Sequence, residues 1–134
     1  MVEATAPIIR LYGNLIVPVR AVSDDGVPRL LDEVTGRIAS ESARGLILDV
    51  SGLAYMDSFV TRVVRDLALI ARLMGVTTVL AGVAPEVAIT IIEMGLELQG
   101  VVTTLNLERA LEQLARMQRE EEAYVSGHAQ GFGV

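Results

Sequence analysis

The sequence predicts a single α/β domain, in which four helices cover a five-stranded, mostly parallel sheet that begins with an N-terminal hairpin. Three observations predict this class. The chain has 134 residues, 51% of them apolar and 21% charged, which suits one domain with a sizeable core. Short apolar runs alternate with helical patterns, as in parallel sheets built from right-handed crossovers. No apolar run approaches the roughly 20 residues that a membrane-spanning helix needs.

The N-terminal third contains the predicted hairpin and the first helix. Residues 8–19 form two apolar runs separated by Gly13-Asn14, a pair that tolerates positive φ and therefore predicts the turn. The polar residues 23–26 supply an N-cap, and the helix that follows is expected to end near Gly45. Its apolar positions at helical spacing are Val27, Leu30, Leu31, Val34 and Ile38.

The remaining elements follow as an alternation of strands and helices. The predicted strands cover residues 45–50, 76–81 and 101–105, and the predicted helices cover residues 57–74, 85–95 and 106–122. The last helix is capped by Asn106 and has Leu107, Ala110, Leu111, Leu114 and Met117 on one side. We expect the domain to span residues 1–122, followed by a flexible tail at residues 123–134 that is rich in glycine.

The composition excludes most enzyme classes. The chain has no cysteine, which removes disulfides, thiolate nucleophiles and iron–sulfur clusters. All eleven basic residues are arginine, so a Walker A loop, a Schiff-base site and a kinase active site are each without their lysine. The one histidine, His128, lies in the predicted tail. We therefore expect no catalytic site, no cofactor and no metal.

Charge and the N-terminal sequence bear on partners and location. The net charge of −6 disfavours nonspecific nucleic-acid binding, which needs a basic surface to displace counterions. The N-terminus lacks the basic-then-apolar order of a signal peptide, so we expect a cytoplasmic protein without nucleic-acid or membrane partners.

The most informative segment is an Asp-Ser pair at the start of the predicted second helix. Asp57 can accept a hydrogen bond from the first backbone N–H groups, which is worth about 0.5–2 kcal/mol. Ser58 then lies in the first helical turn. Because such pairs are common, the simplest interpretation is that the two residues only cap the helix.

The helical pattern adds that Ser58 should be exposed. The predicted apolar side comprises Val60, Val63, Val64, Leu67, Ile70, Ala71 and Met74, whereas Ser58, Arg62, Arg65, Leu69 and Arg72 lie opposite. A phosphoserine would add about −1.5 to −2 charges, which Arg62 and the unpaired N–H groups of the first turn would partly stabilise. The pattern favours Ser58 as a phosphate acceptor, although the arginines also fit an ordinary solvated face.

At this point the sequence resembles a known family. The stretch LILDVSGL at residues 46–53, followed by MDS at residues 56–58, resembles the signature of STAS domains, which occur in sulfate transporters and anti-sigma-factor antagonists. The resemblance covers roughly residues 8–120, and the predicted element order agrees with it. The antagonists usually continue Ser-Ser-Gly, whereas this chain continues Ser58-Phe59-Val60-Thr61-Arg62 and looks more like the RsbS branch, the small stressosome scaffold.

The resemblance implies a non-enzymatic regulatory role. A partner-switching serine/threonine kinase of the RsbT type would bind the unphosphorylated scaffold, phosphorylate Ser58 after stress and leave, and a serine phosphatase would reset the system. RsbR-type STAS paralogues would share a large assembly in which homo-oligomer contacts are expected. Asp57, Phe59, Arg62 and Arg65 would surround the phosphate and the partner.

Two further hypotheses stay open. One is an anti-sigma-factor antagonist that acts as a small soluble phospho-switch. The other is a ligand-binding or enzymatic α/β domain, since such folds place ligands at the C-terminal ends of parallel strands, where Asp49 and Ser51 lie. For Asp49 we favour a structural role at the strand end. The sequence also leaves open whether Thr61 or Thr90 is modified.

Overall fold

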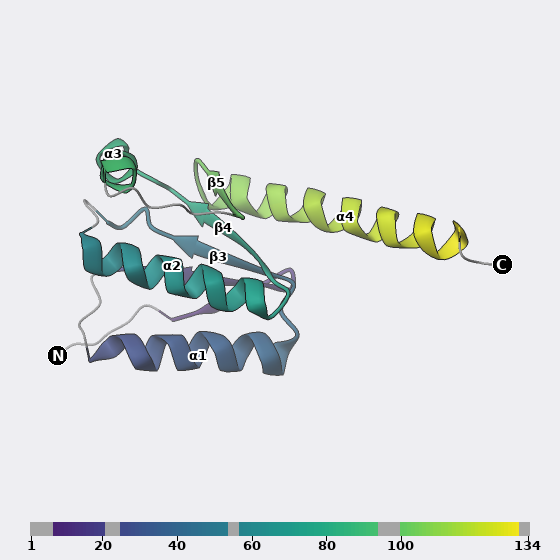
Figure 1. The fold of residues 1–134 in the computed structure, drawn as a ribbon, viewed down its shortest axis with the longest axis horizontal. Helices are drawn as coiled ribbons and strands as arrows, with labels where there is room; N and C mark the ends of the chain where they lie inside the picture. Colours follow the sequence, from purple (N-terminus) through teal and green to yellow (C-terminus); the bar gives the residue numbers. More distant parts are fainter. Residues whose placement is uncertain (1–6, 21–24, 54–56, 94–99, 132–134) are drawn as a thin grey trace.

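The computed structural model describes residues 7–20, 25–53, 57–93 and 100–131, with side chains through residue 127. Strands and helices alternate along these residues, as Figure 1 shows, and the predicted fold class is confirmed. The elements are β1 (Ile9–Leu11), β2 (Asn14–Pro18), α1 (Gly26–Glu41), β3 (Gly45–Asp49), α2 (Ser58–Leu73), β4 (Thr77–Ala81), α3 (Pro85–Glu93), β5 (Val101–Thr104) and α4 (Leu107–Gly131).

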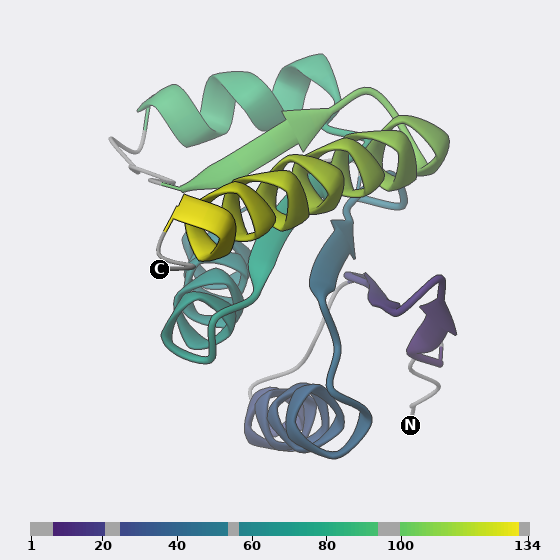
Figure 2. The same cartoon turned by 90° about the vertical axis from the view of Figure 1, so that its right-hand side faces the viewer.

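The sheet follows the chain, in the order β1-β2-β3-β4-β5. Only β1 is antiparallel to its neighbour; the other pairs are parallel, with Leu15 opposite Leu46 and Ile47 opposite Val79. Because each crossover advances in the same direction and is right-handed, α1, α2 and α3 must share one face of the sheet. The helix α4 follows the last strand and covers the other face (Figures 1 and 2).

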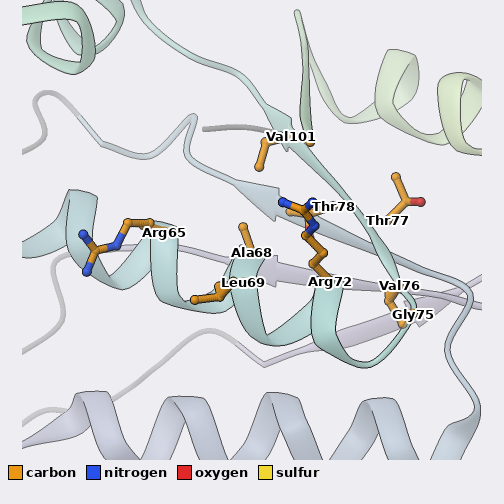
Figure 3. Close-up of a pocket in the computed structure, with 10 residues that line it drawn as sticks. Arg65, Ala68, Leu69, Arg72, Gly75, Val76, Thr77, Thr78 and Val101 are labelled. Carbon is orange, nitrogen blue, oxygen red and sulfur yellow. The ribbon is translucent and has the colours of Figure 1, made fainter. Parts of the chain in front are cut away.

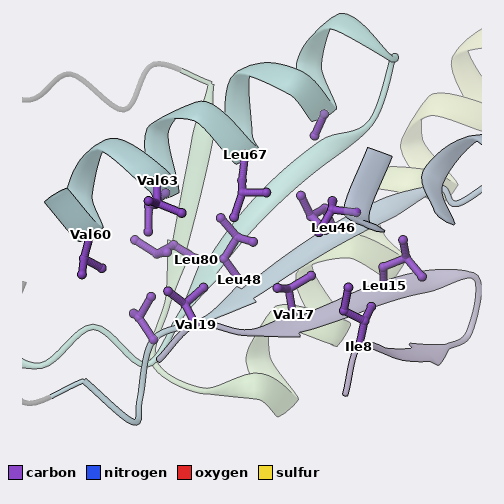
Figure 4. Packing of buried hydrophobic residues seen from close by; sticks show 14 of the residues in the cluster. Ile8, Leu15, Val17, Val19, Leu46, Leu48, Val60, Val63, Leu67 and Leu80 are labelled. Atoms are coloured by element: carbon purple, nitrogen blue, oxygen red, sulfur yellow. The ribbon is translucent and has the colours of Figure 1, made fainter. Parts of the chain in front are cut away.

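Two apolar clusters hold these layers together. The larger lies between the sheet and the helices α1 to α3, and Figure 4 shows Leu67 of α2 above Leu48 and Val17 of the strands. The smaller joins Ile47 and Val79 to Ala110 and Leu114 of α4. Strand β3 therefore has apolar contacts on both faces, as its continuous apolar run predicted.

The hairpin turn lies one residue earlier than predicted. Leu11 pairs with Asn14, so the two turn residues are Tyr12 and Gly13, with φ values of 54° and 79°. A two-residue turn of this kind needs positive φ at both central positions, and Gly13 takes the second of them. Asn14 belongs to β2 instead, where it is only 2% exposed and accepts a hydrogen bond of 3.0 Å from Gln118 of α4.

The helix ends also differ from the predictions. The expected end of the last helix near Glu122 is wrong, because α4 continues through Gly131 and projects past the sheet (Figure 1). Its acidic and small residues continue a helix readily, and one internal glycine costs only about 1 kcal/mol. The mobility of residues 123–134 stays a prediction. The first helix ends at Glu41 rather than near Gly45, and Asp25 holds its N-cap position without a side-chain hydrogen bond.

The expected end of the third helix at Gly95 lies outside the described residues. Among the residues that are described, no helix is both long and apolar enough to cross a membrane.

Candidate functional site

At the C-terminal edge of the parallel strands, the residues that follow β3 and β4 pack closely against each other. Asp49 accepts hydrogen bonds from the backbone N–H and the hydroxyl of Ser51, at 3.0 and 2.7 Å. Gly82, which follows β4, has a φ of +80°, and a Cβ on it would lie 2.7 Å from the Ser51 Cβ. The Asp49 carboxylate therefore organises its own turn, as the structural interpretation predicted, and position 82 leaves no room for a side chain beside Ser51.

The capping prediction at the start of α2 is confirmed. Asp57 has an extended backbone, and its carboxylate accepts a hydrogen bond of 2.8 Å from the Val60 N–H. Its carbonyl oxygen accepts from both the N–H and the hydroxyl of Thr61, at 3.0 and 2.7 Å. These contacts fix where the helix begins and place Ser58 as its first residue.

The two predicted faces of α2 are present with two exceptions, one of which is Ile70, predicted on the apolar side but only half-buried. The exposed residues include Ser58, Arg62, Arg65, Leu69 and Arg72, as predicted. The buried residues are Val60, Thr61, Val63, Val64, Leu67, Ala68 and Ala71. Met74 was predicted to be buried, which is wrong: α2 ends at Leu73, so Met74 leaves the helical path and is 36% exposed.

The predicted site residues separate into a near group and a distant residue. Asp57, Ser58 and Arg62 lie within one helical turn, since four residues rise about 6 Å. Phe59 is half-buried and packs against the larger apolar cluster. Arg65 lies about 10 Å further along the helix than Ser58 and pairs with Asp66 at 3.4 Å. Arg62 makes no ion pair with any residue that the structure describes.

Thr61 and Thr90, whose modification the sequence left open, differ from Ser58 in their surroundings. Thr61 is completely buried, and its hydroxyl donates to the Asp57 carbonyl. Thr90 is half-buried, and its hydroxyl donates to the Glu86 carbonyl at 2.9 Å. Both hydroxyls therefore bond back to the preceding helical turn, which Ser58 cannot do because it begins its helix. The sequence signal for this difference is the position of each hydroxyl relative to the helix start.

Within the described part of the chain, no three acidic or histidine side chains gather into a metal-binding group. The site is therefore an exposed serine hydroxyl at a capped helix N-terminus, with one arginine a turn away. Such a terminus carries a partial positive charge and favours an anion. The fold and this site define a small α/β domain that presents a hydroxyl group to solvent.

The family follows from a comparison with known proteins. A family model described as the STAS domain matches residues 10–114. The chain belongs to the STAS domain family, which confirms the predicted resemblance. Among curated proteins of Bacillus subtilis (strain 168), it is similar to "RsbT co-antagonist protein RsbRA", with 25% identity over 117 residues. It is also similar to "RsbT co-antagonist protein RsbRC", with 31% identity over 111 residues.

These relatives are longer than the region that matches. The matches cover 86% and 81% of this chain but only 43% and 39% of RsbRA and RsbRC. The chain thus spans less than half the length of these curated relatives.

Two solved structures match over nearly their whole chains. Moorella thermoacetica RsbS S58E has a TM-score of 0.77 and 36% identity, covering 87% of this chain and 99% of that chain. A structure described as the molecular architecture of the stressosome, a signal integration and transduction hub, has a TM-score of 0.77 and 38% identity. It covers 84% of this chain and 99% of the matched chain. Within the STAS family, the chain is therefore similar to RsbS-type stressosome proteins.

Proposed function

We propose that the chain is a non-enzymatic scaffold of a cytoplasmic stress-signalling assembly, which holds a serine/threonine kinase and releases it when Ser58 is phosphorylated. The observation that carries the proposal is the exposed Ser58 at the capped N-terminus of α2. The similarity to RsbS and stressosome structures supports the scaffold role. The names of the RsbR relatives, RsbT co-antagonists, point to an RsbT-type kinase as the partner.

Ser58 is favoured over the neighbouring hydroxyls by access. A kinase must bring a hydroxyl to the γ-phosphate in line, so the acceptor side chain has to enter the kinase active site. Ser58 meets this condition because it is exposed and is the first residue of the helix. Thr61, buried and bonded to the Asp57 carbonyl, would have to leave the core first.

A phosphate on Ser58 is compatible with the fold. At an exposed helix N-terminus an anion is favoured by about 0.3–1 kcal/mol. Arg62 lies one turn away and has no competing ion pair among the described residues. The apolar contacts of α2 lie on its opposite face, so the added charge does not touch the core.

In a complex with the kinase, by contrast, the same phosphate is expected to be unfavourable. An uncompensated charge buried at an interface costs several kcal/mol. Each 1.4 kcal/mol changes affinity about tenfold, so phosphorylation is expected to weaken kinase binding by about two orders of magnitude. The Asp57 carboxylate, adjacent in sequence, adds like-charge repulsion. The scaffold contacts made by other surfaces, with RsbR-type paralogues or further copies of this chain, would survive.

Phosphate labelling tests the acceptor. The protein is incubated with the RsbT-type kinase of the same organism and labelled ATP, and phosphosites are mapped by mass spectrometry. Ser58→Ala should lose the label, whereas Ser40→Ala, an exposed helical serine on α1, should keep it. Equal labelling of Ser58→Ala and the wild type would exclude Ser58. A serine phosphatase added afterwards should remove the label and restore kinase binding.

Binding and particle size test the scaffold role. Calorimetry should give a kinase affinity that falls by about two orders of magnitude after stoichiometric phosphorylation. Mixed with its RsbR-type paralogue, the chain should elute from gel filtration as a very large particle. A small complex with an anti-sigma factor would instead support the alternative, an anti-sigma-factor antagonist. Kinase affinity that does not change on phosphorylation would contradict the release mechanism under either reading.

A further inference from the structure

A cavity of about 490 Å³ lies at the end of α2 remote from Ser58. It opens between the last turns of α2 and the first residues of β4 and β5, as Figure 3 shows. Ligand sites for small molecules typically measure about 300–1,000 Å³. From Ser58 to Arg72 the helix rises about 21 Å, so this cavity is separate from the proposed phosphorylation site.

The charged groups that line the cavity are both cationic. Arg65 and Arg72 contribute to its wall, and no acidic residue does among the residues that the structure describes. Arg72 has no hydrogen bond or ion pair within the described residues, and Arg65 pairs only with its sequence neighbour Asp66, at 3.4 Å. Two guanidinium groups without a tightly bound carboxylate are the kind of groups that recognise an anion.

A buried hydroxyl gives the cavity a second polar feature. Thr78 is only 3% exposed, and its Oγ1 is a buried side-chain oxygen that has no hydrogen-bond partner within the described structure. It lies on the same side of β4 as Leu80, which packs in the cluster beneath α2. In Figure 3 the Arg72 side chain extends from α2 toward Thr78. Buried hydroxyls are nearly always paired, so this one has room for a further partner, which could reach it only after a neighbouring side chain moves aside.

The rest of the wall is apolar. Ala68 and Leu69 of α2 and Val101 of β5 line the cavity beside the polar groups. A bare inorganic ion would leave these side chains without contacts. A molecule with one charged end and a compact apolar body would use both kinds of wall.

We propose that this cavity binds a small organic anion, a carboxylate or phosphate monoester carried on a compact apolar body. Arg72 and Arg65 take the anionic group, which also accepts a hydrogen bond from the Thr78 hydroxyl. The apolar body lies against Leu69 and Val101. Apart from Arg65, which the sequence analysis placed near the phosphate and the partner, the cavity shares no residue with the surface around Ser58 and Arg62, so its test does not depend on the proposed kinase switch.

Titration of the isotope-labelled full chain tests the site. Phenyl phosphate, benzoate and inorganic phosphate serve as probes, and amide chemical shifts report where each one binds. Phenyl phosphate or benzoate should produce saturable shifts at Ala68, Arg72, Thr78 and Val101, and bind more tightly than inorganic phosphate. The relative affinities of phenyl phosphate and benzoate then assign the anionic group. If neither organic probe gives saturable shifts at these amides, the proposal is wrong.

Matched variants separate the site from general charge effects. Arg72→Gln should weaken the better probe about tenfold or more, since a charge-assisted hydrogen bond is lost. Arg29→Gln removes an exposed arginine from α1 and should leave binding unchanged. Equal losses in the two variants would overturn the proposal.

The Thr78→Val variant tests whether the Thr78 hydroxyl takes part in ligand binding or affects only the stability of the fold. It should raise the melting temperature of the ligand-free protein, because an unpaired buried hydroxyl is replaced by a methyl group of similar shape. It should also weaken probe binding. Higher stability with unchanged affinity would remove Thr78 from the site and contradict the proposal.

Discussion

The two faces of α2 have opposite properties although they belong to the same 16 residues. One face contributes seven buried residues to the layer between helix and sheet. The other presents the serine and the arginines to solvent. Since the exposed face contributes little to the core, chemistry on it can change without unfolding the domain. Stability and the proposed signalling function are therefore separated by helical phase rather than by position along the chain.

Two hydroxyl groups make the contrast sharpest. Ser58 and Thr61 are three residues apart, yet Ser58 is exposed and Thr61 is completely buried. The helix start decides this difference, because Asp57 caps the helix and directs the next turn inward. Changes to either face test how complete the separation is.

The largest expected effect is the loss of a buried leucine. Leu67 is 0% exposed and Leu69 is 51% exposed, so the same truncation can be made on each face of one helix. Leu67→Ala should lower the free energy of unfolding by about 2–5 kcal/mol, because transfer free energy is lost and a cavity remains. Leu69→Ala should stay within about 0.5 kcal/mol of the wild type. Urea denaturation measures both, and similar losses would contradict the assignment of faces.

The N-cap of α2 should contribute less to the stability of the fold than the buried leucine. Asp57→Ala removes the acceptor for the Val60 N–H and should cost about 0.5–2 kcal/mol. Asp57→Asn keeps a side-chain oxygen at the cap and should cost clearly less. Thermal denaturation of the three proteins measures the order. If the asparagine variant were as unstable as the alanine variant, charge rather than the capping hydrogen bond would stabilise this terminus.

The hydroxyl groups of Thr61 and Ser58 provide the next test, in which a smaller change in stability is expected. Thr61→Val keeps the volume of the side chain but loses the hydrogen bond to the Asp57 carbonyl, which should cost about 0.5–1.5 kcal/mol. Ser58→Ala should change the free energy of unfolding by less than about 0.5 kcal/mol. Chemical denaturation of both variants gives the comparison. A Ser58→Ala variant that is the less stable of the two would mean that Ser58 has a structural role.

The sequence predicted the elements because their signals are local. Apolar run length, helical spacing and glycine or proline at element ends depend on neighbouring residues, so the order of elements and the exposed position of Ser58 were both predicted. The hairpin turn was misplaced because Tyr12 adopts positive φ. A bulky residue such as tyrosine rarely has this conformation, so the sequence did not indicate it. Met74 was misplaced because the helical pattern was extended one residue beyond the end of α2.

The cavity near Arg72 could not be predicted from the same signals. Its walls come from α2, β4 and β5, and the gap between a helix and a sheet depends on three-dimensional packing. The one local hint was Thr77-Thr78 within an otherwise apolar strand, where a polar side chain facing a helix needs a partner. The sequence does not say on which face Thr78 lies, and only the strand register decides that.

The smallest expected effect concerns a half-buried charge pair on α1, which tests how much such a pair contributes to the stability of the fold. A hydrogen bond from Arg37, 2.6 Å long, lowers the pKa of Glu41 below its ordinary value of 4.5, with further help from the charges of Arg37 and Arg10. Arg37 also donates to the Ile8 carbonyl at 2.7 Å, which links the residue before β1 to α1. Because the lowered pKa belongs to the folded state, this pair stabilises the fold at neutral pH.

That contribution should disappear as the pH falls from about 4.5 through the lowered pKa of Glu41, where the folded state must take up the proton. Glu41→Gln should therefore be slightly less stable than the wild type at pH 7, and the difference should vanish in acid. Urea denaturation across this pH range measures it. The side chains of Arg37 and Glu41 are 28% and 25% exposed, and solvent still screens their charges, so the effect should be well below that of Leu67→Ala. A difference that grows as the pH falls would contradict the pairing, because protonation of Glu41 removes its attraction to Arg37.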